Sequence, residues 1–284
     1  MELIHYKTID STNTEALRRL SSAQNIRSLD QTVIAAYEQT AGRGRLKRAF
    51  YSPAKTGIYF TAIHAPKEPI QAPAKLTAAA AVAVCRSLEE FFNVDAKIKW
   101  VNDIYVNEKK VCGILAEGHI SPDGHIDAAA IGIGINIYPS DFPAEIASRA
   151  GAVLGGSDSF GSPEFFGSSD NREQAQEAAA SNDCKTKKQA RDIRLELARD
   201  VSQKLFGLLE DGGQKPGNWE ATAAEYAARS FIVGKTVTVI PVIGDERSSY
   251  AATVLGIDKE ARLLVRLDDG SERALSSGEI SIRV

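Results

Sequence analysis

The segment Glu38-Gln-Thr-Ala-Gly-Arg-Gly-Arg-Leu-Lys-Arg48 follows directly on an apolar run, Thr32–Tyr37, that is typical of a buried strand. In its middle, Gly42 and Gly44 alternate with two arginines. Glycine lets the backbone approach a ligand closely, and arginine supplies planar, bidentate donors for phosphate or carboxylate. The segment therefore predicts an anion-binding loop that follows a strand. A solvated basic turn is the alternative.

A second polar segment predicts a hairpin that brings a lysine back to an Asn-Asp pair. Asn102 and Asp103 follow an apolar-flanked tryptophan, and a turn at Asn107-Glu108 leads into a strand that begins at Lys110. The carboxylate of Asp103 could hold Mg²⁺, as in sites that bind nucleotide phosphates. Lys110 could neutralise charge that develops on a phosphoryl group. The alternative is an ordinary turn beside a solvated strand lysine.

Composition restricts the class of protein. The chain of 284 residues is long enough for one large and one small domain. A net charge of −3 disfavours a protein devoted to nucleic acid. Its three cysteines, Cys85, Cys112 and Cys184, lack metal-ligand spacing and suit a reducing cytoplasm. The sequence begins with no signal-peptide pattern, and its longest apolar run is too short to span a membrane.

Hydrophobic periodicity predicts an α+β fold with a mixed, mostly antiparallel sheet and packed helices. A Thr12-x-x-Glu15 capping box is expected to open the first helix. The expected helices are Thr12–Leu20, Pro73–Phe92, Arg191–Leu209 and Trp219–Arg229. The expected strands are Thr32–Tyr37, Gly57–His64, Lys97–Trp100, Ile104–Val106, Lys110–His119, His125–Ile137, Lys235–Ile240, Tyr250–Ile257, Leu263–Leu267 and Ile280–Val284.

Two domains are expected. Residues 1–230 would form the larger one, and residues 231–284 a small C-terminal β-barrel of SH3-like kind, with a hairpin turn at Asp268-Asp-Gly270. Residues 151–185 are polar and rich in glycine and serine, so they predict a flexible insertion.

Six motifs, in order, resemble those of the bacterial biotin–protein ligases over nearly the whole chain. They are Asp10–Ala16, Gln39–Arg45, Lys99–Asp103, Lys110–Leu115, Gly132–Asn136 and Ser277–Ser281. The resemblance implies a class II synthetase-like biotin/lipoate ligase catalytic domain. It also implies a single-function ligase, because the first motif begins at Asp10 and leaves no room for the DNA-binding domain of the ligases that double as repressors.

The resemblance implies an ATP-dependent reaction in two steps. Biotin is activated as biotinyl-5'-AMP with release of pyrophosphate, and it then passes to a lysine of a biotin carboxyl carrier protein. That carrier would belong to acetyl-CoA carboxylase or to another biotin-dependent carboxylase or decarboxylase. ATP and biotin are the implied substrates and Mg²⁺ the implied metal. No DNA and no membrane partner are expected, and a cytoplasmic monomer or weak homodimer is implied.

The roles of individual residues are carried over by motif. Lys110 and Arg45 are the implied catalytic residues, and Asp103 is the implied metal ligand. The implied biotin-binding residues are Ser11, Thr12, Asn13, Gln39, Gly42, Arg43, Gly44, Arg45, Lys110, Gly132 and Gly134. The implied ATP-binding residues are Arg43, Arg45, Asn102, Asp103, Asn136 and Arg283.

The chain departs from the family pattern at a few places. Val101 stands where proline is usual, Phe50 where tryptophan is common, and Leu46-Lys47 where the loop more often has Arg-Gly. Lys47 is expected to resist a positive φ that glycine would accept. Two other functions remain open at this point. A lipoate–protein ligase would share the fold but normally has a triple-glycine loop, and an RNA-binding module would need aromatic residues interleaved with the arginines.

Overall fold

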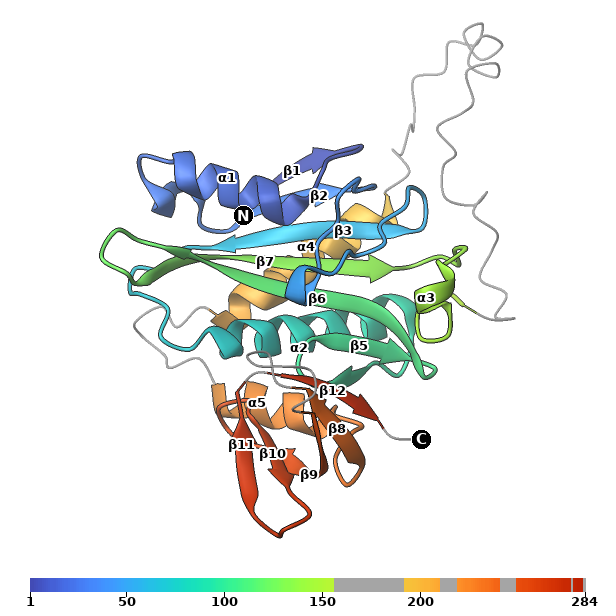
Figure 1. The fold of residues 1–284 in the computed structure, drawn as a ribbon. Helices are drawn as coiled ribbons and strands as arrows, with labels where there is room; N and C mark the ends of the chain where they lie inside the picture. The colour runs from blue at the N-terminus through green and yellow to red at the C-terminus, as the bar shows by residue number, and fades with distance from the viewer. Residues whose placement is uncertain (156–191, 210–218, 241–248, 277, 283–284) are drawn as a thin grey trace, which may run out of the picture.

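A computed structural model describes residues 1–155, 192–209, 219–240, 249–276 and 278–282 (Figure 1). Only residues 151–155 of the expected insertion are therefore described, and Arg283 and Cys184 lie outside the described residues. Within the described part of the chain, no helix is long and apolar enough to cross a membrane.

The larger unit is built on a seven-stranded sheet in the order β1-β2-β3-β7-β6-β5-β4. The strands are β1 Glu2–Tyr6, β2 Thr32–Ala36, β3 Gly57–His64, β4 Lys97–Lys99, β5 Asp103–Val106, β6 Lys109–Ile120 and β7 Ile126–Asn136. Only β1 and β2 pair in parallel, and the other neighbours are antiparallel. The predicted mixed, mostly antiparallel sheet is thus confirmed, although β1 was not among the expected strands.

Helices cover both faces of this sheet (Figure 1). Helix α1 (Thr12–Ser22) packs on one face, where Ala16 and Leu20 meet Ile34 of β2. Helices α2 (Pro73–Phe92), α4 (Ile193–Leu209) and α5 (Trp219–Ala228) share the main core with the opposite face, and a short helix, α3 (Ala144–Ala147), follows β7. Neighbouring residues of β2 enter different cores because strand side chains alternate between faces.

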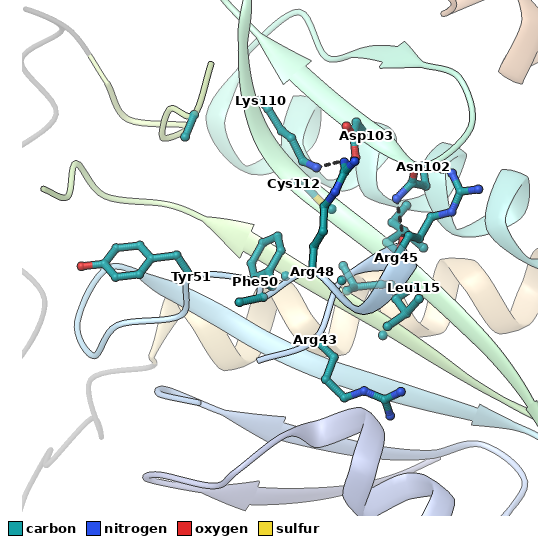
Figure 2. Close-up of a pocket in the computed structure, with 18 of the residues that line it drawn as sticks. Arg43, Arg45, Arg48, Phe50, Tyr51, Asn102, Asp103, Lys110, Cys112 and Leu115 are labelled. Atoms are coloured by element: carbon teal, nitrogen blue, oxygen red, sulfur yellow. Dashed lines mark hydrogen bonds and ion pairs between the residues drawn. The ribbon is translucent and has the colours of Figure 1, made fainter. Parts of the chain in front are cut away.

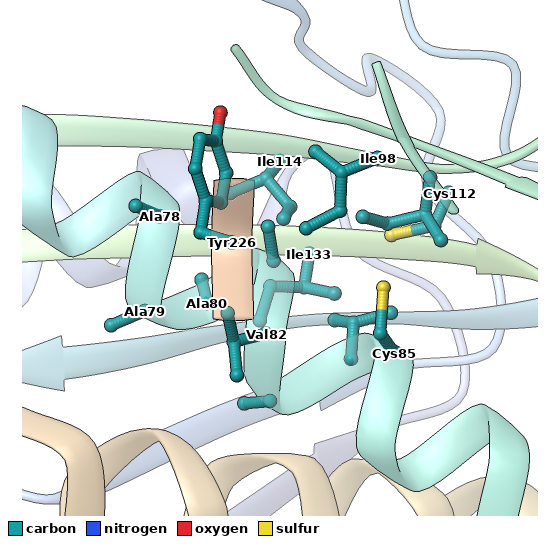
Figure 3. Close-up of a cluster of buried hydrophobic side chains, with 14 of the residues drawn as sticks. Ala78, Ala79, Ala80, Val82, Cys85, Ile98, Cys112, Ile114, Ile133 and Tyr226 are labelled. Atoms are coloured by element: carbon teal, nitrogen blue, oxygen red, sulfur yellow. The ribbon is translucent and has the colours of Figure 1, made fainter. Parts of the chain in front are cut away.

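Helix α2 forms the centre of the main core (Figure 3). It begins at Pro73, whose missing N–H costs nothing in the first turn. Its four consecutive alanines Ala78–Ala81 are all fully buried, so the helix is narrow on every side at this level and its neighbours can approach closely. The helix ends at Asn93, which takes the left-handed conformation with φ of 51°. Its bounds agree with those predicted from the sequence.

The C-terminal unit is a five-stranded antiparallel sheet in the order β11-β10-β9-β8-β12. Its strands are β8 Thr236–Ile240, β9 Tyr250–Ile257, β10 Leu263–Arg266, β11 Glu272–Leu275 and β12 Glu279–Ile282. The expected turn at Gly270 is present, with φ of 83°, whereas β11 was not expected. The small antiparallel C-terminal unit is thus confirmed, and no pairing of described residues joins β11 to β12, so its closure into an SH3-like barrel stays a prediction. The proposed domain boundary at 230/231 stays a prediction.

Candidate active site

We call residues 42–50, which contain the alternating glycines and arginines, the Gly/Arg loop. A cavity of about 400 Å³ lies between this loop, strands β6 and β7, and the C-terminal sheet. From the C-terminal sheet unit, Ile240, Gly278 and Ile280 contribute to its wall. The site residues expected from the sequence that line it are Ser11, Thr12, Asn13, Gln39, Arg43, Gly44, Arg45, Asn102, Asp103, Lys110, Gly132, Gly134 and Asn136. Segments from all six motifs and from both sheets therefore converge on one site. Gly42 is absent from this lining.

The charge of the cavity lining is strongly unbalanced. Among the described residues, the cationic ones in the lining are Arg43, Arg45, Arg48, Lys99, Lys110 and Arg149, and the one carboxylate is that of Asp103. Arg48, Lys99 and Arg149 were not among the sequence candidates. Arg48 had a visible signal, since it closes the basic run of the loop. An excess of cations in a concave site favours a polyanionic ligand.

Lys110 and Asp103 form an ion pair at the mouth of the predicted hairpin. The Nζ atom of Lys110 lies 2.6 Å from Oδ1 of Asp103, and their side chains are 29% and 22% exposed. Lys110 is paired with Tyr105 in the β5–β6 register, which brings its side chain close to Asp103 (Figure 2). The contact has the geometry of an ion pair rather than of a directed hydrogen bond, so Oδ1 of Asp103 is buried without one.

The side chains of Arg43 and Arg45 point in different directions (Figure 2). Arg45 donates from NH1 to Oδ1 of Asn102 at 3.3 Å and from NH2 to the carbonyl of Gly278 at 3.2 Å. Arg43 instead donates to Glu117 at 2.8 Å. Lys47 does not take a positive φ, as expected for a residue other than glycine, and its neighbour Leu46 takes the left-handed conformation instead, with φ of 54°.

A hydrogen-bond network orders the α1 end of the cavity. Oε1 of Gln39 accepts from the backbone N–H of Thr12 at 2.9 Å and from its hydroxyl at 3.2 Å. Asn13 donates both amide hydrogens within the protein, to the carbonyl of Leu115 and to Glu117, and its Oδ1 lies 2.6 Å from the hydroxyl of Thr61. These side chains are pre-oriented because each is held by several partners.

Ser11, and not Thr12, is the N-cap of α1. Its side chain accepts from the backbone N–H of Thr14, whereas the Thr12 hydroxyl is engaged by Gln39 and Thr61. The sequence correctly predicted a side-chain cap at the start of this helix, but it placed the cap at Thr12, one residue too late. Ser11 is 2% exposed, and among the described residues its hydroxyl hydrogen has no acceptor, which leaves it for a ligand.

The glycines of β6 and β7 make room for the protein's own side chains. A Cβ atom at Gly134 would lie 2.5 Å from the Phe50 ring, and one at Gly113 would lie 2.9 Å from the same ring. A Cβ atom at Gly132 would lie 2.0 Å from Oδ1 of Asn13. Gly113 and Gly134 face each other across the strands, so together they seat Phe50. The expected contacts of Gly132 and Gly134 with a ligand stay predictions.

Two sequence profiles match the chain. Residues 6–136 match the biotin/lipoate A/B protein ligase family, and residues 233–283 match the biotin protein ligase C-terminal domain. Both profiles coincide with the elements that build the cavity.

The chain is similar to individual proteins of known name. It is 38% identical over 150 residues to the bifunctional ligase/repressor BirA of Bacillus subtilis, which covers 52% of this chain and 45% of that protein. It is 37% identical over 130 residues to a biotin–[acetyl-CoA-carboxylase] ligase of Paracoccus denitrificans, which covers 45% of this chain and 51% of that protein. The matches thus span about half the length of these two relatives.

The fold as a whole has a solved counterpart. The structure of the biotin protein ligase from Aquifex aeolicus in complex with biotin and ATP superposes with a TM-score of 0.67 at 25% identity. The superposition covers 99% of this chain and 98% of that one.

Proposed function

We propose, from the premise that this chain belongs to the biotin protein ligase family, that it is an ATP-dependent biotin–[biotin carboxyl-carrier protein] ligase. One observation carries the proposal: thirteen of the site residues expected from the sequence line one cavity, whose described lining holds six cationic residues and one carboxylate. Such a cavity suits two anionic substrates that must be held together. The similarity to a ligase solved with biotin and ATP supports the same substrates here.

In the proposed first step, a biotin carboxylate oxygen bonds to the α-phosphorus of ATP. The bond between that phosphorus and the bridging oxygen breaks, and pyrophosphate leaves. Lys110 and Arg45 would stabilise the charge that develops on the phosphoryl oxygens, and the loop would align the two anions. No enzyme nucleophile is required.

In the proposed second step, a lysine amine of the carrier attacks the acyl carbon of biotinyl-5'-AMP. The new C–N bond forms as the C–O bond to AMP breaks, and the amine loses a proton. Relatives named biotin–[acetyl-CoA-carboxylase] ligase support a biotin carboxyl carrier protein as the acceptor. The absence of DNA binding and a monomer or weak homodimer in the cytoplasm stay predictions.

The residues present fit one kind of magnesium site. Within the described part of the chain, no group of three or more His, Cys, Asp or Glu side chains could hold a metal by itself. Mg²⁺ at nucleotide sites, however, usually takes one or two carboxylates together with substrate phosphates and water. Asp103, whose buried Oδ1 lacks a hydrogen bond, would supply that carboxylate. The ion would screen the phosphates when bound.

The profile at residues 6–136 covers lipoate ligases as well as biotin ligases, so the substrate must be tested. The purified protein should catalyse exchange of labelled pyrophosphate into ATP with biotin and Mg²⁺. Two comparison reactions are run, one with lipoate in place of biotin and one with neither acid. Exchange with lipoate alone would replace the proposed substrate, and exchange with neither would remove the proposed reaction.

A further inference from the structure

Glu117 lies outside every motif and outside the cavity lining, yet it joins two of the site's polar residues. Its Oε1 accepts from NH2 of Arg43 at 2.8 Å, and its Oε2 accepts from Nδ2 of Asn13 at 2.9 Å. Glu117 belongs to β6, where it is paired with Ala130 of the central strand β7. One carboxylate on the rigid sheet therefore contacts both the Gly/Arg loop and helix α1.

The loop has further described contacts, among them the packing of the Phe50 ring on Gly113 and Gly134 of the sheet. Its own hydrogen bonds run from Gly44 N to Arg48 O at 2.8 Å and from Phe50 N to Gly42 O at 2.9 Å. At its far end, Arg45 contacts Asn102 and the C-terminal unit. Arg43 is the side chain that ties the near end of the loop to β6.

We propose that Glu117 is a positioning residue that holds the Gly/Arg loop closed over the cavity through its ion pair with Arg43. The ion pair directs the Arg43 side chain away from the cluster formed by Lys110, Asp103 and Arg48 (Figure 2). Arg43 then acts as an anchor for the loop, which leaves Arg45 to face the reacting groups.

The geometry supports an anchor of moderate strength. The Arg43 side chain is 45% exposed, so solvent screens the pair, whereas Glu117 is 22% exposed and already fixed by Asn13. Exposed ion pairs contribute about 0.2–1 kcal/mol, which corresponds to about a twofold to fivefold change in an opening equilibrium.

Hydrogen exchange of the ligand-free protein tests the anchor without assuming any activity. The reporters are the hydrogen-bonded amides of Gly44, Arg48 and Phe50. In Glu117→Gln and in Arg43→Gln, these amides should exchange about twofold to fivefold faster than in the parent. The double variant should exchange no faster than either single variant, because both remove the same contact. Salt at about 0.5 M should speed exchange in the parent and reduce the difference.

A matched control comes from the same hairpin. Asp127 on β7 pairs with His119 on β6 at 2.8 Å and is 19% exposed, but it does not contact the loop. Asp127→Asn should leave exchange of the loop amides unchanged. Amides of β7 such as Ile131 report global stability and should exchange equally in all variants.

The consequence for catalysis rests on the proposed function. Glu117→Gln should release biotinyl-5'-AMP into solution about twofold to fivefold faster, with the rate of pyrophosphate exchange at saturating substrates little changed. A parent that makes no adenylate would refute the proposed function, while the exchange data would still decide the anchor. Parental exchange of the loop amides in Glu117→Gln would overturn the anchor. Faster exchange in Glu117→Gln but not in Arg43→Gln would do so too, because Glu117 would then act through Asn13.

Discussion

Lys110 and its neighbour Lys109 differ in what their ammonium groups contact. Lys110 lies in the cavity 2.6 Å from Asp103, whereas Nζ of Lys109 donates to the carbonyl of Ser148 at 2.6 Å and does not line the cavity. We expect Lys110→Ala to lower biotin-dependent pyrophosphate exchange by about 10²–10³, the usual effect of losing one group that stabilises a transition state. Lys109→Ala is the matched control and should stay within a few-fold of the parent.

The fold should survive the Lys110 substitution, because the side chain is partly exposed and lies at a hairpin. Far-UV circular dichroism and the free energy of unfolding check this point. Near-parental exchange by Lys110→Ala, or an equal loss in Lys109→Ala, would contradict the assignment of Lys110.

The sequence predicted those site residues that lie close together along the chain in short motifs. Arg43, Arg45, Asn102 and Asp103 were all predicted, and the structure brings them together around one cavity. Glu117 could not be predicted in this way, because its importance comes from partners that are distant in the sequence. Thr61 and Arg149 were missed for the same reason.

At the scale of elements, predictions succeeded where apolar periodicity was strong. Helix α2 and strands β3 and β9 have the predicted bounds because their apolar patterns end at clear breaks. Strand β1 was missed because it is short, lies at the sheet edge and is half exposed. Strand β11 was missed because its sequence, Glu272–Leu275, is half charged and mostly exposed. Edge strands carry polar residues to avoid pairing with other chains, which removes the alternation that sequence analysis needs.

The seating of Phe50 on two strands leads to a prediction about Gly134. A methyl group there would lie 2.5 Å from the ring, so Gly134→Ala should lower the free energy of unfolding by about 1–3 kcal/mol through overpacking. Phe50→Leu in the same chain should recover part of the loss, because the smaller side chain leaves room. Urea unfolding of the two single variants and the double variant measures the coupling. Additive losses would mean that the ring does not occupy the space above Gly134.

An ion-pair network joins helices α2 and α5. Glu225 accepts from Arg86 and Arg229, and Arg229 also contacts Glu89. Burial alone would raise the pKa of Glu225, but hydrogen bonds from the two arginines outweigh it and hold the pKa below its ordinary value of 4.5. A lowered pKa contributes stability above the unfolded-state pKa and loses it as the pH falls through the folded-state value.

We therefore expect Glu225→Gln to be less stable than the parent at pH 7, and we expect this difference to shrink as the pH falls below about 4.5. The measurement is the free energy of unfolding in urea at pH 7 and at pH 3. The exposed Glu145 of α3 offers a control, since Glu145→Gln should match the parent at both values. A difference that stayed constant with pH would show that the charge of Glu225 is not the source of its effect.

For the whole molecule, the main core runs without interruption from α2 into the C-terminal sheet. Trp100, Tyr226, Val239, Val254 and Leu263 belong to one buried cluster. Sequence analysis predicted two units from a change of pattern near residue 231, but it could not show that they share a core. Its short strands and turns indicated a small β domain without specifying which strands pair.

Both tryptophans of the chain hold the C-terminal sheet by the same turn. Nε1 of Trp100 donates to the carbonyl of Ala261 at 3.0 Å, and Nε1 of Trp219 donates to that of Lys259 at 2.6 Å. They differ in burial, since Trp100 is 3% exposed and also packs against Gly278 at the cavity wall, whereas the bond of Trp219 is open to solvent. Water can replace the exposed bond but not the buried one.

This contrast predicts different costs for the same substitution. Trp100→Phe leaves the Ala261 carbonyl without its buried donor and opens space beside Gly278, so the free energy of unfolding should fall by about 1–3 kcal/mol. Trp219→Phe should cost less than about 1 kcal/mol, because water can satisfy the Lys259 carbonyl. Urea unfolding followed by circular dichroism measures both. Trp100→Phe should also weaken ATP binding, since Arg45 donates to the carbonyl of Gly278, a residue that lies beside this indole. Equal losses of stability in the two variants would mean that the buried bond does not join the two units.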